Sequence, residues 1–273
     1  MKKVILVTGA SSGIGKATAL KLLKDGHIVY GAARRIEKMK DIEDAGGTAL
    51  EMDVLKEDQM QAAVDRIISE NQRIDVLFNN AGYAIYGAVE DTTIEDARRQ
   101  FEVNIFGLAR MTQLVLPQMR KQRSGTIINT SSMGGKIYTP LGAWYHATKH
   151  ALEGWSDCLR IELKPFGIDV VIIEPGIILT EFGDVMTQPI TERSGQGPYK
   201  GLAESIIKAT QEAYKDPKGS SPPSVIANEV SKAVAAKRPK TRYAAGKFAK
   251  LMITLRKWLT DRMFDSIVMS QVR

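Results

Sequence analysis

Five residues near the middle of the chain, YHATK at positions 145–149, combine side chains that could carry acid–base chemistry. Tyr145 and Lys149 stand four residues apart, so a helix would place the phenol and the ammonium one turn apart on the same face. A free phenol has a pKa near ~10, which is too high for a base at neutral pH. A neighbouring ammonium favours the phenolate. Tyr145 is therefore a candidate general acid and base, and Lys149 is the group that tunes it.

The two histidines of this segment allow a different interpretation. His146 and His150 have the i, i+4 spacing of a pair of metal ligands. A zinc-protease helix with this spacing also carries a glutamate after the first histidine as the base, whereas Ala147 stands there. Only one other histidine, His27, occurs in the chain. We therefore favour the Tyr/Lys pair, expect no metal site, and assign the histidines to packing or the surface.

The elements that must position this pair alternate regularly along the chain. Short apolar runs typical of strands covered on both faces are KVILVTG, HIVYGAA, TALEMDV, IDVLFNN, GTIINTSS and DVVIIEPG. Helical patterns lie between them, at residues 13–24, 56–70, 92–122 and 142–164. This alternation, with right-handed crossovers, predicts an α/β fold with a doubly wound parallel sheet. Ligands of such a sheet bind beyond the carboxyl ends of the strands.

Two segments depart from this alternation. Residues 180–223 are rich in Gly, Pro and Ser, and we interpret them as an irregular substrate lid. Residues 247–272 carry apolar side chains at helical spacing with Lys and Arg between them. The sequence thus predicts one domain over 1–246, with the substrate loop at about 180–223, and a C-terminal amphipathic helix over 247–273. Such an apolar stripe more often packs on its own protein, and peripheral contact with an anionic membrane is the alternative.

The composition is that of an ordinary soluble globular protein. Of the 273 residues, 44% are apolar and 25% are charged, and no apolar run approaches the ~18 residues that span a bilayer. The net charge of +7 is concentrated after residue 236, which disfavours a nucleic-acid-binding face spread over the fold. The single cysteine, Cys158, cannot form an internal disulfide, so we expect a cytoplasmic protein with Cys158 buried on a helix.

A glycine-rich loop, VTGASSGIG, follows the first predicted strand and opens the first helix. Its glycines permit a tight turn and let backbone N–H groups approach a pyrophosphate at the helix N-terminus. The spacing is G-x-x-x-G-x-G rather than the more common G-x-G-x-x-G. Its place after the first strand nevertheless favours a nucleotide site. The residues expected to contact the nucleotide are Gly9, Ser11, Ser12, Gly13, Ile14 and Gly15.

The end of the second strand, GAARR, indicates which dinucleotide would bind. Folds that bind NAD usually place an acid there, roughly 20 residues after the glycine turn, to bond the ribose 2′-hydroxyl. Here Ala32 and Ala33 are followed by Arg34 and Arg35. An arginine suits a 2′-phosphate, which it can bind through parallel charge-assisted hydrogen bonds. We therefore predict NADP(H) in preference to NAD(H), with Arg34 as the main contact and Arg35 beside it.

Five motifs occur in the order and spacing of one known family, and they cover residues 1 to about 180. They are TGASSGIG at 8–15, NNAG at 79–82, NTSS at 129–132, YHATK at 145–149 and PG at 175–176. The chain thus resembles the short-chain dehydrogenase/reductase family. This resemblance implies a Rossmann-type oxidoreductase that uses NAD(P)(H) and acts on an alcohol or a ketone. Tyr145 would take the alcohol proton or return it to the ketone, and Ser132 would hydrogen-bond the substrate oxygen.

The resemblance implies further roles. Lys149 would also hold the nicotinamide ribose, and Asn104 would hold a relay water, which makes the catalytic set Asn104, Ser132, Tyr145 and Lys149. Cofactor contacts implied in the same way are Asp53 and Val54 at the adenine, Asn80, Ala81 and Gly82 at the adenosine ribose, and Pro175, Gly176, Ile178 and Thr180 at the carboxamide. A homodimer or homotetramer would pack through helices 92–122 and 142–164. A dinucleotide sensor or scaffold is the non-enzyme alternative, and the complete catalytic set favours an enzyme.

The residues expected around the cleft are mostly bulky and apolar. They are Tyr83, Ile85, Tyr86, Ile137, Tyr138, Leu141, Trp144, Ile177 and Leu179. Such a lining predicts a large hydrophobic small-molecule substrate, a secondary alcohol or its ketone. With the longer C-terminus, it makes the chain similar to the hydroxysteroid and retinol dehydrogenase branch of the family. The enzymatic alternative is a 3-oxoacyl thioester reductase, whose acidic acyl carrier protein would need a basic patch near the cleft mouth.

Overall fold

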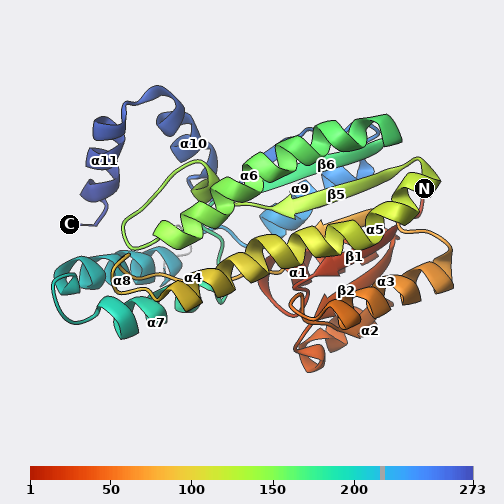
Figure 1. The fold of residues 1–273 in the computed structure, drawn as a ribbon, viewed down its shortest axis with the longest axis horizontal. Coiled ribbons are helices and arrows are strands. Elements are labelled where there is room, and N and C mark those ends of the chain that lie inside the picture. The colour runs from red at the N-terminus through yellow and green to blue at the C-terminus, as the bar shows by residue number, and fades with distance from the viewer. Residues whose placement is uncertain (216–218, 273) are drawn as a thin grey trace.

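The computed structural model describes residues 1–215 and 219–272 and contains one seven-stranded sheet (Figure 1). All strand pairs are parallel, and the strand order is β3-β2-β1-β4-β5-β6-β7. The strands are β1 (Val4–Thr8), β2 (Ile28–Ala33), β3 (Thr48–Glu51), β4 (Val76–Asn79), β5 (Gly125–Thr130), β6 (Ile168–Pro175) and β7 (Arg242–Ala245). The predicted doubly wound, Rossmann-type fold is confirmed. The seventh strand had no apolar run long enough to predict it.

Helices cover both faces of the sheet, which explains the continuous apolar runs. Leu6, Leu77 and Ile127 face one layer, formed by α3 (Glu57–Asn71), α5 (Leu108–Gln122) and α6 (Ala143–Leu163). Ile5, Phe78 and Ile128 face the other layer, which includes α1 (Gly13–Lys24) and α9 (Ser224–Ala235). Short segments after β2 complete the fold, namely η1 (Ile36–Met39) and α2 (Lys40–Asp44), and η4 (Lys164–Phe166) precedes β6.

The helix predicted at 92–122 contains a π-helical turn that sequence patterns did not indicate. It begins as α4 (Ile94–Phe101), continues as η2 (Glu102–Gly107) and ends as α5. Thr93 caps the start, because its hydroxyl accepts a hydrogen bond from Asp96 N at 3.1 Å. The π turn leaves Asn104 2% exposed and Phe106 55% exposed. It therefore directs an amide into the protein and a phenyl ring out of it.

The prediction of an irregular lid at 180–223 was wrong. The segment contains two helices, α7 (Phe182–Ser194) and α8 (Lys200–Lys215), and residues 216–218 lie outside the described residues. Glycine, proline and serine are concentrated at 194–198 and 219–223, where they separate helices rather than fill a loop. The two helices form a hairpin whose buried face includes Ile190 and Ile206.

The single C-terminal helix predicted over 247–272 is also two helices, α10 (Ala249–Trp258) and α11 (Asp261–Ser270). Leu259 and Thr260 between them have extended backbone, with ψ of 147° and 160°. Asp261 then stands in the first turn of α11, where an acid favours a helix start. This hairpin lies at the same end of the molecule as α7 and α8, opposite the N-terminus (Figure 1).

The apolar stripe of this C-terminal hairpin is divided between core and surface. Phe264 and Val268 are buried against Ile137, in the loop that follows β5. Trp258, in contrast, is 77% exposed. Within residues 1–215 and 219–272, the structure has no helix of the length and apolar character needed to traverse a bilayer.

Candidate active site

Helix α6 places Tyr145 and Lys149 on its buried face, at the carboxyl ends of the central strands. Lys149 Nζ donates a hydrogen bond of 2.8 Å to Thr130 O, the last residue of β5, and lies 5.9 Å from the centroid of the Tyr145 ring. Burial raises the pKa of Tyr145 to about 12, which a hydrogen bond with Ser132 opposes. Burial lowers the pKa of Lys149 to about 8, and the Glu153 carboxylate opposes this shift.

Ser132 and Asn104 reach the same place from two other elements. Ser132 follows β5 and caps η3 (Met133–Gly135), because its hydroxyl accepts from Gly134 N at 3.0 Å. Asn104 Nδ2 donates to Tyr83 O at 2.9 Å and to Thr148 Oγ1 at 3.2 Å. Asn104 is thus connected to α6 through Thr148, the neighbour of Lys149. Ser132 lies near enough to Tyr145 to lower the pKa of its phenol.

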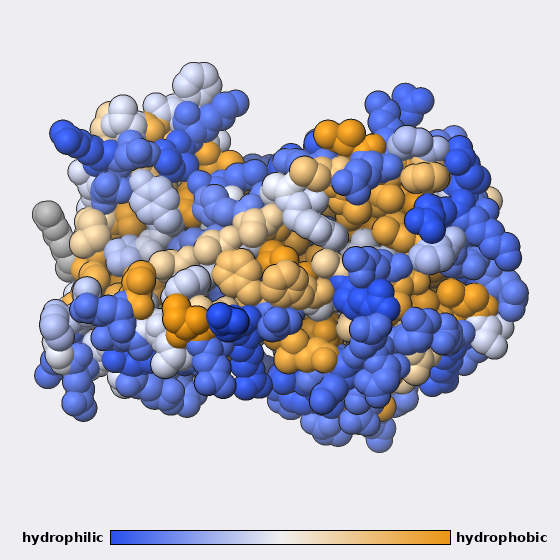
Figure 2. All heavy atoms as spheres, in the orientation of Figure 1, coloured by the Kyte–Doolittle hydropathy of each residue, from blue (hydrophilic) through white to orange (hydrophobic). Residues whose placement is uncertain are grey.

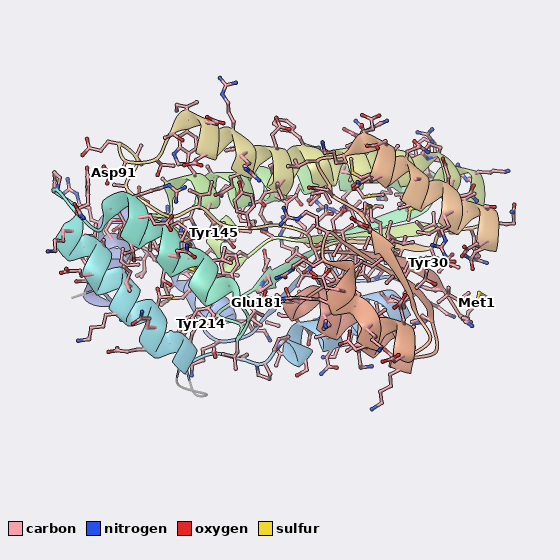
Figure 3. All side chains as sticks on the ribbon, turned by 90° about the horizontal axis from the view of Figure 1, so that it is seen from below. Met1, Tyr30, Asp91, Tyr145, Glu181 and Tyr214 are labelled. Atoms are coloured by element: carbon pink, nitrogen blue, oxygen red, sulfur yellow. The ribbon has the colours of Figure 1, made fainter. Side chains whose placement is uncertain are left out.

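Aromatic and aliphatic side chains enclose the Tyr145 ring. The ring centroids of Tyr86 and Phe182 each lie 5.7 Å from that of Tyr145. Tyr145 also belongs to a buried cluster with the lid residues Ile190 and Ile206. Figure 3 shows Tyr145 above the lid helices α7 and α8, with Tyr214 on the lid below it. The phenol therefore lies in a packed apolar cluster to which α6, α7 and α8 contribute.

The sequence predicted only part of this cluster. Tyr86 and Leu141 were predicted and belong to it, whereas Phe182 was missed with the lid helices. Tyr214 of α8 was missed as well, and burial and the nearby Tyr145 raise the pKa of its phenol. The signal that could have found it is the helical spacing of apolar residues over 200–215.

Three residues lie elsewhere than predicted. Trp144 packs edge-on against Phe101, with centroids 6.5 Å apart, and lines a groove on the outer face. It directly precedes Tyr145 on α6, so its side chain points about 100° away around the helix. The Tyr138 hydroxyl donates to Asp265 Oδ1 at 2.9 Å, which places this ring under the C-terminal hairpin. Cys158 is exposed rather than buried, because it lies on the solvent face of α6.

Both nitrogens of the buried His146 ring have neighbours at hydrogen-bond distance. Nδ1 lies 2.9 Å from Gly134 O, and Nε2 lies 2.9 Å from Thr139 Oγ1. These contacts tie the start of α6 to the loop that carries Ser132. Within the described part of the chain, His, Cys, Asp and Glu form no group of three or more that could hold a metal ion.

The glycine loop and the NNAG segment pack against each other. Gly9 and Gly13 adopt positive φ values of 67° and 53°. A Cβ atom at Gly15 would lie 2.2 Å from Gly9 O, so this turn has no room for a side chain. Thr8 Oγ1 accepts hydrogen bonds from the backbone N–H groups of Asn80 and Ala81, each at 3.0 Å. The glycines of this loop therefore leave its backbone uncovered by side chains where a pyrophosphate would approach.

A cavity of about 710 Å³ lies beside this loop. It is lined by Ser11, Ser12 and Gly13 on one side and by Thr180 and Glu181 on the other. Predicted cofactor contacts from distant parts of the chain thus meet here, and Ile14 stands in the adjoining first turn of α1. This space beside a closely packed glycine turn fits a dinucleotide.

The remaining predicted cofactor residues do not line this cavity. Gly82 adjoins Asn104, since a Cβ atom there would lie 3.1 Å from Asn104 Oδ1. Pro175 ends β6, and Gly176 N donates to Ala245 O at 2.8 Å. Ile178 is buried. Asp53 and Val54 follow the edge strand β3, where Asp53 Oδ1 accepts from Leu55 N at 3.0 Å.

The two predicted arginines behave differently. Arg35 donates to Ser12 Oγ at 3.1 Å and pairs with Glu181 at 3.2 Å. Lys38 lies 3.6 Å from the same carboxylate. Arg34 is exposed. Arg35 is therefore the arginine that lies against the glycine loop, and it forms an ion pair with Glu181.

The sequence of the chain matches a known protein family over most of its length. The sequence profile of the short chain dehydrogenase family matches residues 3–190. The chain belongs to this family. It is therefore an oxidoreductase of the kind that acts on CH–OH groups with a nicotinamide dinucleotide, as predicted.

Three relatives illustrate the similarity. A 3-ketodihydrosphingosine reductase from Bacteroides thetaiotaomicron is 40% identical over 265 residues, covering 96% of this chain and 95% of that protein. The crystal structure of a short-chain dehydrogenase from Streptomyces avermitilis has 33% identity and a TM-score of 0.79, covering 99% of this chain and 95% of that one. The 3-ketoacyl-(acyl-carrier-protein) reductase from Brucella melitensis, complexed with NADH, has 26% identity and a TM-score of 0.72, covering 86% and 91%.

Proposed function

We propose that this protein is an NADP(H)-dependent oxidoreductase that interconverts a bulky hydrophobic secondary alcohol and its ketone. The observation that carries the proposal is the Tyr145 phenol, which lies near Ser132 and Lys149 and packs in an apolar cluster with residues of α7 and α8. The dinucleotide, when bound, supplies or accepts the hydride. Tyr145 donates its proton to the ketone oxygen, and Ser132 hydrogen-bonds this oxygen as negative charge develops there. The Lys149 ammonium makes the phenol a stronger acid.

The apolar surroundings of Tyr145 support a long aliphatic ketone as the first candidate substrate. The cluster around the phenol consists of aromatic and aliphatic side chains, and its burial keeps water away from the ring. The similarity to a 3-ketodihydrosphingosine reductase extends over nearly the whole chain, lid included. We therefore propose a long-chain 3-ketone as the substrate class. A 3-oxoacyl thioester is the second candidate, in view of the similarity to the Brucella reductase.

The preference for NADP(H) rests on the charges at the end of β2. Ala32 and Ala33 stand where an acid would bond a ribose 2′-hydroxyl, and Arg35 and Lys38 gather at the cavity mouth. We expect NADPH to bind at least about 10-fold tighter than NADH, because a charge-assisted hydrogen bond contributes about 1.5–3 kcal/mol. Fluorescence titration with both nucleotides measures this ratio.

The same titration on Arg34→Ala, Arg35→Ala and Arg66→Ala shows which arginine sets this binding ratio. Loss of Arg35 should lower the ratio by about 10-fold, and Arg66→Ala, on the exposed face of α3, should leave it unchanged. Equal binding of NADPH and NADH would contradict the cofactor preference.

The substrate class is tested by reduction of 3-ketodihydrosphingosine, a 3-oxosteroid and an acetoacetyl thioester with NADPH. Efficient reduction of the thioester alone would refute the long-chain assignment.

We also propose a homodimer or homotetramer that packs through α4, α5 and α6. Phe106 is exposed on η2, between α4 and α5, and Ile161 is exposed on α6. A groove of about 320 Å³ on this face is lined by Ile94 and Trp144. Figure 2 shows apolar side chains along the middle of this face. Phe106→Glu is expected to yield monomers in light scattering, whereas Trp258→Glu, exposed elsewhere, should not. A monomeric wild-type protein would exclude this interface.

A further inference from the structure

Two buried carboxyl groups lie behind the catalytic lysine, and the proposed chemistry does not use them. Glu153 stands one turn after Lys149 on α6, and Glu174 directly precedes Pro175 at the end of β6. Both are almost fully buried. Burial of a carboxylate is costly unless charged or hydrogen-bonding partners compensate. Glu153 and Glu174 therefore require partners that compensate for their burial.

Two cations hold the pair. Glu153 Oε2 accepts from Lys136 Nζ at 2.8 Å and from Arg242 at 3.0 Å. Arg242 Nε also lies 3.4 Å from Glu174 Oε1. Lys136 comes from the loop that follows Ser132, and Arg242 comes from β7. On its outer side Arg242 pairs with Asp157 of α6 at 2.7 Å, and Asp157 pairs with Arg160. The charged groups around Glu153 thus come from α6, β6, β7 and the Ser132 loop.

Three oxygen atoms in this region remain without hydrogen-bond partners among the described residues. They are Glu153 Oε1, Glu174 Oε1 and Ser131 Oγ. Ser131 and Glu153 converge, because a Cβ atom at Gly135 would lie 2.6 Å from Ser131 Oγ and 3.0 Å from Glu153 Cγ. A proton on one carboxyl would supply a donor in addition to the Ser131 hydroxyl. Consistent with this, burial and the Glu153 carboxylate raise the pKa of Glu174 to about 7.

We propose that Glu153 and Glu174 are positioning residues that set the charge of Lys149: Glu153 stabilises the ammonium, and Glu174 shares the proton of the pair. The carboxylate one turn from Lys149 keeps the lysine cationic although burial favours the neutral amine. Without Glu153, the ammonium loses its proton at lower pH. The catalytic consequence rests on the proposed function, since a neutral Lys149 leaves Tyr145 a weaker acid.

The test follows Lys149 itself and needs no substrate. In protein labelled with ¹³Cε-lysine, the Lys149 signal is assigned by its loss in Lys149→Met and titrated with pH. We expect Glu153→Gln to lower the pKa of Lys149 by about one unit. Glu174→Gln should lower it by less, because Glu153 is the carboxylate that acts on Lys149 and Glu174 is only the second member of the pair. The matched control is Asp157→Asn, which loses the same Arg242 partner at a side chain that is 37% exposed and should leave Lys149 unchanged.

An unchanged Lys149 titration in Glu153→Gln, or an equal shift in Asp157→Asn, would overturn the inference. Should Glu153→Gln fail to fold, Glu174→Gln decides in the same way. With a ketone that the enzyme reduces, the alkaline limb of the pH–rate profile of Glu153→Gln should move to lower pH by the same amount. A limb that stays in place would overturn the link to catalysis. Absence of turnover on every ketone would refute the proposed function and leave the Lys149 titration valid.

Discussion

Tyr145→Phe is expected to lower kcat/KM for ketone reduction by about 10³-fold and to leave NADPH binding within about threefold of wild type. The substitution removes the only atom that can donate the proton to the ketone oxygen from this ring. The phenyl ring keeps its packing against Tyr86 and Phe182, so the apolar cluster around residue 145 should retain its shape. Steady-state kinetics and fluorescence titration on the same preparation separate the chemical effect from cofactor binding.

The control removes the same atom outside the cleft. Tyr138→Phe deletes a hydroxyl that bonds Asp265 under the C-terminal hairpin and should change kcat/KM by less than about threefold. Tyr145→Phe that retains a tenth or more of the wild-type activity would show that another group supplies the proton.

Gly15→Ala is expected to weaken NADPH binding by at least about 100-fold and to lower the melting temperature. The added methyl would lie 2.2 Å from Gly9 O and 2.6 Å from Asn80 Nδ2, and both residues are predicted cofactor contacts. Backbone cannot yield as a flexible side chain can, and overpacking of this kind costs about 1–3 kcal/mol or more. The loop must move, and its N–H groups then no longer face the pyrophosphate. Thermal unfolding and nucleotide titration measure the two effects.

Gly154→Ala provides the opposite case within the same protein. Gly154 lies inside α6, and beyond its own helix backbone no described residue comes within 4 Å of the place that the added methyl would take. Alanine should therefore stabilise the fold by about 0.5–1 kcal/mol. If Gly15→Ala bound NADPH as tightly as wild type, the glycine loop would not be the pyrophosphate site.

Periodicity predicted the central sheet because strands covered on both faces have to be apolar throughout. The runs at β1 and β4–β6 are almost entirely buried, as strands between two layers of helices must be. The lid and the C-terminal hairpin were mispredicted because their stability depends on tertiary packing. Phe264 and Met263 are neighbours in sequence, but only Phe264 packs against Ile137 in the core, whereas Met263 is exposed. The π turn at η2 is likewise invisible in a pattern of apolar spacing.

The site shows the same division. Tyr145 and Lys149 are close in sequence, so helical geometry alone joins them. Arg242 and Glu174 are joined only because β6 and β7 are neighbours in the sheet, and β7 was not predicted. Phe182 reaches Tyr145 only when α7 folds over the cleft. Motifs therefore locate the groups that react, whereas the groups that enclose and tune them depend on the completed fold.

Two consecutive residues at the start of the lid contact opposite ends of the cleft. Glu181 pairs with Arg35 at the nucleotide loop, and Phe182 packs on the Tyr145 ring. A nucleotide phosphate that takes Arg35 must displace Glu181, and the adjoining Phe182 moves with it. The two ligands are then thermodynamically linked, so the factor by which the dinucleotide changes the affinity for the ketone equals the factor by which the ketone changes the affinity for the dinucleotide.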